Sequence, residues 1–282
     1  MKPHQDSFPM LSRVFVISIL LLITLLQTSM AQDSLGVRCV GKLHNYEMWN
    51  NATGIVVSGN CGYVATGLTG LRIVDIQNPD RPVEIGHFVT GQSIKDVVLV
   101  GNLAILASYE QGIKIVDVSN PSSPFQVGSL DITNTKKIII EGNLGYALCG
   151  QGVTAFTFNQ PSNPSIVGTY SPTGSAYAYD VSDTRAYIFS SWYGGSLGSG
   201  YRFYYQFSIV SFLTPNNPQI LNSSTREYSR YNGIKVMGNT AFIFDDTDIK
   251  TYRIDDSLHF NLLGTYDRNP IMPTSFQFCD SM

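Results

Sequence analysis

Few residues of this chain have the types and spacing that catalysis or metal binding requires. His44, His87 and His259 are far apart, and the sequence has no His-Glu-x-x-His zinc motif and no Cys-x-x-Cys pair. No catalytic residue and no metal ligand is therefore assigned. Asp96 and Asp180 are the acidic side chains to consider for acid-base chemistry or calcium binding. Their positions differ by two residues relative to the turns that follow them, so we expect polar lining residues rather than a matched pair of ligands.

Aromatic side chains with polar ends are concentrated in one glycine-rich segment, SSWYGGSLGSGYRFYYQ, residues 190–206. Trp, Tyr and Arg are enriched at recognition hot spots, so this segment predicts a mobile ligand-binding loop. The alternative is a β-hairpin extension whose aromatic side chains pack on the body of the protein. The candidate binding residues are Trp192, Tyr193, Tyr201, Arg202 and Tyr204, together with Tyr109, Glu110, Asp245 and Asp246 from neighbouring loops.

The elements that would position these residues come from an internal repeat. The stretch GLRIVDIQNPDRPVEIG at residues 70–86 returns as GIKIVDVSNPSSPFQVG at residues 112–128, an offset of 42 positions. Each unit has a Gly-Asn turn, a strand rich in β-branched residues, a Pro-x-x-Pro turn and a short strand with an apolar-Gly pair. The first landmark is Gly59-Asn60, Gly101-Asn102, Gly142-Asn143, Asp183-Thr184 and Gly238-Asn239; the proline pairs begin at Pro79, Pro121, Pro161 and Pro215.

Four short strands fit between these turns, and a period in the low forties with four strands is typical of a propeller blade. The predicted fold is an all-β β-propeller of four-stranded antiparallel blades. Its five full repeats are expected approximately at residues 52–88, 89–130, 131–170, 171–224 and 225–266. One blade is too thin to bury its own faces, so the apolar pattern recurs because each blade must pack against its neighbours.

The stretches LRIVDI and IKIVDV, each followed by Asn-Pro-x-x-Pro, resemble the LVIVD repeat family. The resemblance extends from about residue 52 to 266 and is strongest in the first two units. It implies an extracellular or cell-surface propeller and supplies no catalytic residues. It also implies that the Gly-Asn and Pro-x-x-Pro turns share one rim, which leaves the variable connections of the other rim as the expected binding face. Residues 190–206 lie among those connections, and we expect them to fold over the channel mouth.

Two further patterns have a structural and a functional interpretation. Asp75 and Asp117 end the Ile-Val-Asp strands, where a ring of carboxylates would bind a metal. A short acidic side chain before Asn-Pro can instead accept backbone N–H bonds of the turn, which we favour because later repeats lack the Asp. Two segments, Asn51-Ala52-Thr53 and Asn222-Ser223-Ser224, match glycosylation acceptors and would mark surface loops if the host glycosylates the protein.

The N-terminus has the pattern of an export signal. Lys2 and Arg13 precede the apolar stretch Val14–Leu26, and Ser29-Met30-Ala31 is a small-x-small cleavage site. The apolar stretch is too short for a bilayer-spanning helix, which needs about 20 residues. We predict a signal peptide at residues 1–31 and a secreted or surface-exposed propeller domain at residues 32–282, without a membrane span.

The two chain ends are predicted to contribute opposite edges of an incomplete sixth blade. The segments concerned are Val40–Leu43 and Thr274–Phe278. If these end strands pair directly, Cys39 and Cys279 come close enough for a disulfide; if two strands are missing between them, they do not.

The net charge of −3 argues against nucleic-acid binding, because neutralising the phosphate groups requires an excess of clustered Lys and Arg residues. The leading hypothesis is a secreted or cell-surface binding scaffold that uses the variable rim, has no cofactor and binds an extracellular protein or glycan. The first alternative is a propeller hydrolase or lactonase-like enzyme with a calcium ion in the central channel. The second is a structural spacer within a longer surface protein.

Overall fold

A computed structural model describes residues 52–196, 200–227, 231–245 and 248–267. The predicted export signal, both predicted end strands, Cys39 and Cys279 lie outside these residues. Within the described ranges the regular structure is entirely β, and none of it is a helix long and apolar enough to cross a membrane. Cys61 and Cys149 are free thiols.

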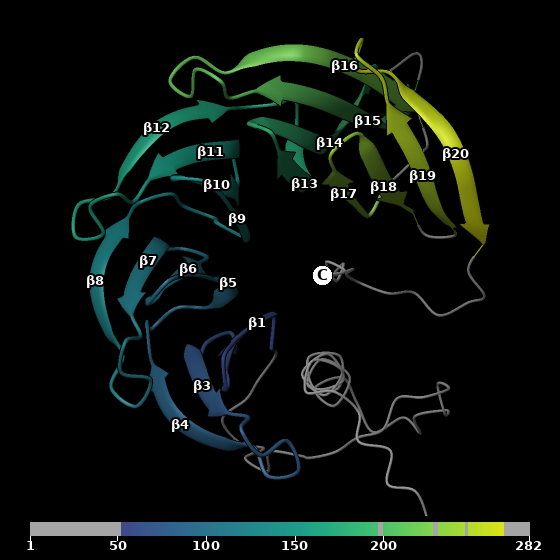
Figure 1. The fold of residues 1–282 in the computed structure, drawn as a ribbon. Helices are drawn as coiled ribbons and strands as arrows, with labels where there is room; N and C mark the ends of the chain where they lie inside the picture. Colours follow the sequence, from purple (N-terminus) through teal and green to yellow (C-terminus); the bar gives the residue numbers. More distant parts are fainter. Residues whose placement is uncertain (1–51, 197–199, 228–230, 246–247, 268–282) are drawn as a thin grey trace, which may run out of the picture. The chain divides into compact units, whose positions relative to one another are not determined.

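The described strands form five four-stranded antiparallel sheets, and each is a meander in chain order (Figure 1). This confirms the predicted five meanders. Sheet one contains β1 (Gly54–Ser58), β2 (Cys61–Ala65), β3 (Leu71–Asp75) and β4 (Val83–Phe88), and sheet two contains β5 (Ile94–Val100), β6 (Leu103–Ser108), β7 (Gly112–Asp117) and β8 (Phe125–Leu130). Sheet three contains β9 (Lys137–Glu141), β10 (Leu144–Cys149), β11 (Gly152–Thr157) and β12 (Ser165–Tyr170). Sheet four contains β13 (Ser175–Ser182), β14 (Arg185–Ser196), β15 (Gly200–Ser211) and β16 (Gln219–Glu227), and sheet five contains β17 (Gly233–Met237), β18 (Thr240–Phe244), β19 (Asp248–Ile254) and β20 (Phe260–Asp267).

The chain divides into two compact units, residues 1–138 and 139–282, which are described separately. In the first unit, Ile73 and Leu106 belong to an apolar cluster between sheets one and two, while Val74 belongs to a second cluster on the other face of sheet one. For this reason the middle strands are buried on both faces. Burial on both faces explains why apolar and polar residues alternate only weakly along these strands. In the second unit, Tyr146 lies in a cluster formed by sheets three and four, and Phe189 in one formed by sheets four and five.

The Gly-Asn landmark is a turn that needs a left-handed backbone. Gly59 and Gly101 have φ of 57° and 56°, and in the fourth repeat Asp183 takes the same conformation with φ of 53°. Asp tolerates positive φ better than most residues with a side chain. The sequence therefore keeps the turn in the fourth repeat although it loses the glycine.

The Asp of Ile-Val-Asp stabilises a turn, as predicted. Asp75 Oδ1 accepts the backbone N–H of Gln77, and Asp117 Oδ1 accepts that of Ser119, both at 2.8 Å. The hydrogen bonds from Ser119 hold the pKa of Asp117 below its usual value. These carboxylates belong to turn structure rather than to a metal ring.

The glycine of the outer strand permits close packing between consecutive sheets. A Cβ added at Gly86 in β4 would overlap the carbonyl oxygen of Pro121, and one added at Gly168 in β12 would overlap that of Pro215. Each proline begins the Pro-x-x-Pro turn of the next sheet. A β-bulge adjoins the glycine in both strands and directs the backbone toward that turn. We call this the glycine–turn contact.

Candidate functional site

The glycine-rich segment forms a continuous hairpin. β14 and β15 pair without interruption from Arg185↔Ser211 to Ser196↔Gly200. The paired residues form the hairpin extension of the alternative prediction rather than an unpaired loop, but Tyr193 and Phe203 of this hairpin stay exposed instead of packing on the body of the protein. Backbone pairing explains the difference: Gly194 and Gly195 lie opposite Arg202 and Tyr201 in the ladder, so they extend the strands instead of interrupting them.

Two aromatic pairs lie directly across this hairpin. Trp192 stacks on Tyr204 with a centroid distance of 5.5 Å and an interplanar angle of 16°, and Tyr193 packs on Phe203 at 5.0 Å. The two pairs lie on opposite faces because neighbouring residues of a strand point in opposite directions. Tyr193 and Phe203 are 60% and 54% exposed. Phe203 was missed by the sequence prediction because only residues with polar ends were selected.

The face of the hairpin that carries Tyr193 and Phe203 continues as a row of aromatic side chains. Counting back along the ladder in steps of two gives Tyr205, and then the pair Phe189 and Phe207, whose ring centroids are 5.0 Å apart. We call these five residues the aromatic track. It runs about 13 Å along the strand from Phe189 to Tyr193, since a strand rises about 3.3 Å per residue.

A pocket of about 290 Å³ lies at the inner end of the aromatic track, between sheets four and five of the second unit. Three residues of the track, Phe189, Tyr205 and Phe207, line it. Further lining residues are Gln206, Asn222, Ser224, Tyr231, Ile243, Tyr252, Leu258, His259 and Phe260. The rings of Phe207 and Phe260 meet edge to face at 5.1 Å, so the two sheets contact each other beside the cavity. Its volume is at the lower end of the range of small-ligand sites, and its lining is mainly aromatic.

The remaining predicted residues have separate roles. Arg202 is exposed. The side chain of Tyr201 and the whole of Asp246 lie outside the part of the chain that the structure describes. Asp245 accepts hydrogen bonds from Asp248 N at 2.9 Å and Lys250 Nζ at 3.0 Å, which stabilise the β18–β19 turn.

The other two predicted residues, Tyr109 and Glu110, belong to the first unit, where Lys95 Nζ lies 5.6 Å from the centre of the Tyr109 ring. Within the described part of the second unit, the structure brings Trp192 and Tyr204 of the predicted set into contact.

Asp96 and Asp180 both accept hydrogen bonds from backbone N–H groups. The carboxylate of Asp96 in β5 accepts the backbone N–H groups of Val97 at 3.0 Å and Ile138 at 2.9 Å. Burial of this carboxyl raises its pKa to about 6, although both N–H donors oppose the shift. Asp180 in β13 is 1% exposed and accepts the N–H of Val236 in β17. Both acids link the first strand of one sheet to that of the next.

Lys235 forms an ion pair with Asp180, Nζ to Oδ1 3.2 Å. Backbone donors thus hold both carboxylates, and Lys235 is a further partner of Asp180. Among the described residues, no group of three or more His, Cys, Asp or Glu side chains could hold a metal ion.

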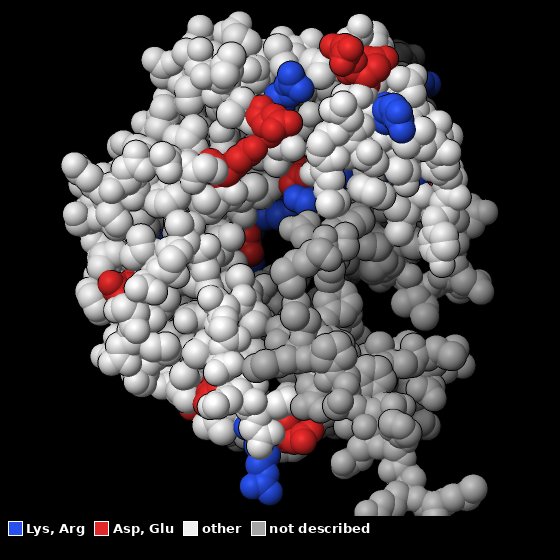
Figure 2. Space-filling view, in the orientation of Figure 1, with Lys and Arg blue, Asp and Glu red and all other residues white. Residues whose placement is uncertain are grey.

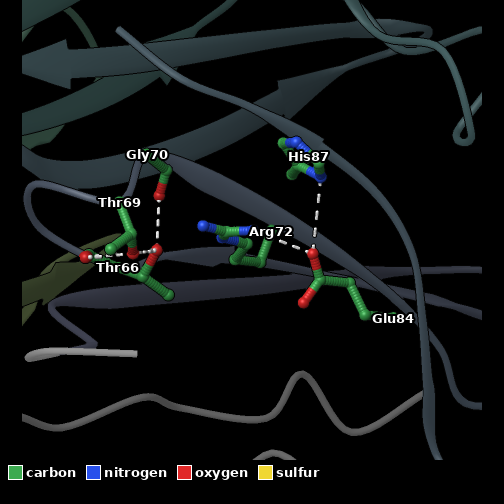
Figure 3. Close-up of polar contacts among 6 residues, drawn as sticks. All are labelled: Thr66, Thr69, Gly70, Arg72, Glu84 and His87. Carbon is green, nitrogen blue, oxygen red and sulfur yellow. Dashed lines mark hydrogen bonds and ion pairs between the residues drawn. The ribbon is translucent and has the colours of Figure 1, made fainter. Parts of the chain in front are cut away.

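Sheet one contains a buried ion pair. Arg72 in β3, 3% exposed, donates from Nη1 to Glu84 Oε1 of β4 at 2.9 Å, and His87 Nδ1 lies 3.6 Å from the same oxygen (Figure 3). Nearby, Thr66 Oγ1 donates to the carbonyl oxygen of Gly70 at 2.7 Å and closes the β2–β3 turn (Figure 3). His87 is thus a neighbour of a structural ion pair, and these contacts explain stability rather than catalysis.

The hairpin tip also contains Gly194-Gly195-Ser196-Leu197-Gly198, which matches the Gly-x-Ser-x-Gly pattern of hydrolase nucleophiles. That motif requires a sharp turn from strand to helix. Ser196 instead ends β14 opposite Gly200, and the described part of the chain has no helix after it. No nucleophile is assigned on this pattern.

Comparison with known proteins supports the repeat and the fold. Residues 50–90 and 91–132 each match the LVIVD repeat. No curated protein sequence matches the chain.

Similar solved structures include a Lactobacillus plantarum protein, with a TM-score of 0.60, 11% identity and coverage of 77% of this chain and 71% of that one. A periplasmic gluconolactonase of Pseudomonas aeruginosa has a TM-score of 0.55, 10% identity and coverage of 78% and 71%. Saccharomyces cerevisiae Sqt1 has a TM-score of 0.57, 9% identity and coverage of 82% and 65%. At these identities the likeness concerns the fold, and the five sheets are the blades of a β-propeller.

Proposed function

We propose that this protein is a secreted or cell-surface interaction scaffold that binds an extracellular partner through the β14–β15 hairpin. The observation that carries the proposal is the pair Tyr193 and Phe203, two large side chains more than half exposed on a fully paired hairpin. Large apolar side chains that stay in water on a rigid element are typical of recognition surfaces, because little conformational entropy is lost when a partner covers them.

The hairpin is a feature of the fourth repeat alone among the described sheets. β14 and β15 each have 12 residues, whereas β6 and β7 of sheet two each have six. Packing of the blade does not require the extra length, since sheets one, two and three bury their cores with short strands. The added residues are therefore available for binding.

The distribution of charge fits a partner that is recognised by shape and apolar contact. On the face shown in Figure 2, charged side chains of the described residues lie in small separate groups of both signs. No extended basic or acidic patch on that face would select a highly charged partner.

An enzymatic role has less support from the described residues. Asp96 and Asp180 are engaged with backbone groups and Lys235, and the hairpin serine lacks the strand-to-helix turn. The likeness to the gluconolactonase, at 10% identity, concerns the fold alone.

The test is binding of the chain without residues 1–31 to arrays of extracellular proteins and of glycans. The test variant is Tyr193→Ser with Phe203→Ser, and the matched control is Val83→Ser with Phe125→Ser, whose side chains are 54% and 55% exposed in the first unit. We expect a partner whose affinity falls at least roughly tenfold in the test variant and is unchanged in the control. Equal binding by both folded variants would refute a role of the hairpin.

A further inference from the structure

The pocket between sheets four and five exists because two landmarks of the repeat are replaced there. In sheet four, Asn222 takes the position that Gly86 and Gly168 hold in sheets one and three, beside the same β-bulge. In sheet five, the turn before β20 is Asp255–His259, without the two prolines. The glycine–turn contact cannot form with a side chain at residue 222.

Asn222 instead extends across the gap between the sheets. Its Nδ2 donates to the carbonyl oxygen of Leu258 in the turn of sheet five at 3.1 Å. Asn222 therefore lies half-buried within β16, and the prediction that its Asn-x-Ser pattern marks a surface loop was wrong. Asn222 and the turn residues Leu258 and His259 all line the cavity.

The chemistry of the walls selects an uncharged ligand with flat apolar faces. Of the described lining residues, none is Lys, Arg, Asp or Glu, and six are aromatic: Phe189, Tyr205, Phe207, Tyr231, Tyr252 and Phe260. Polar groups are contributed by Gln206, Asn222, Ser224 and His259. Oε1 of Gln206 is buried without a hydrogen-bond partner, so a purely apolar ligand would leave it unpaired, whereas a charged ligand would be desolvated without an opposite charge.

The pocket is also continuous with the aromatic track. Phe189, Phe207 and Tyr205 belong to both, and the track continues along the same hairpin face to Tyr193 and Phe203. A ligand seated in the pocket can therefore extend toward the tip over further rings. This geometry fits a chain of ring-shaped units rather than a single small molecule.

On this basis, and resting on the proposed function, we infer that the pocket binds the terminal ring of a neutral saccharide whose following units lie on the aromatic track. A pyranose ring has C–H groups on its faces and hydroxyl groups around its edge. The faces match the aromatic side chains, and the hydroxyl groups match the amide, hydroxyl and imidazole groups of the pocket. A peptide would bring backbone groups at every residue, for which the track offers only side-chain rings.

The probes are cellohexaose, maltohexaose and chitohexaose, with glucose and N-acetylglucosamine as single rings, titrated by calorimetry and ligand-observed NMR up to about 10 mM, where affinities near the millimolar range are measurable. The pocket variants are Asn222→Gly, which restores the residue of the other repeats, and Ser224→Trp, which fills the cavity from an exposed position. The track variant is Tyr193→Ser with Phe203→Ser. Circular dichroism and the melting temperature show that each variant is folded.

We expect at least one hexasaccharide to bind the wild type, with a loss of roughly tenfold or more in both pocket variants and a smaller loss in the track variant. Its matching single ring should lose binding only in the pocket variants. If none of these sugars binds the wild type, the inference about the pocket is overturned. The proposed function still holds in that case if the protein array shows a partner whose affinity depends on Tyr193. If a hexasaccharide loses affinity only in the track variant, the pocket assignment is wrong.

Discussion

The buried carboxyl group of Asp96 makes a measurable contribution to pH-dependent stability. Its pKa is about 6 in the folded protein against 3.8 for an unperturbed Asp, because burial disfavours the charged form. A group with a raised folded pKa contributes stability that is complete below the unfolded value and is lost as the pH rises through the folded one. At about 1.4 kcal/mol per pKa unit, the free energy of unfolding should decrease by about 3 kcal/mol from this group alone as the pH rises from well below 3.8 to well above 6.

The assay compares urea denaturation of the wild type and Asp96→Asn by circular dichroism at intervals from pH 4 to pH 7. Asparagine does not titrate, so the difference in unfolding free energy between the two proteins should change by about 2 kcal/mol across this range, in favour of the wild type at low pH. Asp117→Asn is the control, because the pKa of Asp117 is lowered and its effect has the opposite sign. Parallel pH profiles of wild type and Asp96→Asn would refute the argument that burial dominates over the two N–H donors.

Three further outcomes are expected. Gly86→Ala should destabilise the protein by about 3 kcal/mol in urea denaturation, because its Cβ would overlap the carbonyl oxygen of Pro121. Gly264→Ala, the equivalent change in β20 with no atom within 4 Å of the added carbon, should be close to neutral; equal effects would contradict the packing role. Glu84→Gln should cost about 3 kcal/mol by leaving the buried Arg72 without its anionic partner, and a neutral result would show that the guanidinium is hydrated. Millimolar calcium should leave the melting temperature unchanged, whereas an increase would favour the calcium-dependent enzyme.

The sequence predicts the architecture well because every blade must bury its faces against its neighbours, so the same apolar pattern recurs in each repeat. The turn role of Asp75 and Asp117 follows from one local rule about short acidic side chains before Asn-Pro. The four-stranded meander follows from turn spacing alone. Both signals are local in the chain, so a single sequence contains them.

The candidate site is predicted less well because it depends on departures from the repeat. Asn222 replaces a glycine whose purpose is visible only when the next turn is placed against it. Tyr231, Tyr252 and Phe260 have no distinctive sequence context, yet they line the same cavity as Phe207. The pocket could have been located from residues that differ from the equivalent residues of the other repeats, because the repeats are otherwise alike.

The glycine–turn contact has a consequence for how such a chain can lengthen. Gly86 contacts a turn of the following repeat, and Pro121 in that turn contacts the repeat before it. A repeat with both the outer-strand glycine and the Pro-x-x-Pro turn therefore contains one half of the contact with the next repeat and the other half of the contact with the repeat before it. Tandem duplication of such a repeat copies both halves at once, so a new blade can pack against its neighbours without compensating mutations. Divergence within one repeat, as at Asn222, then changes its contact with the next repeat alone.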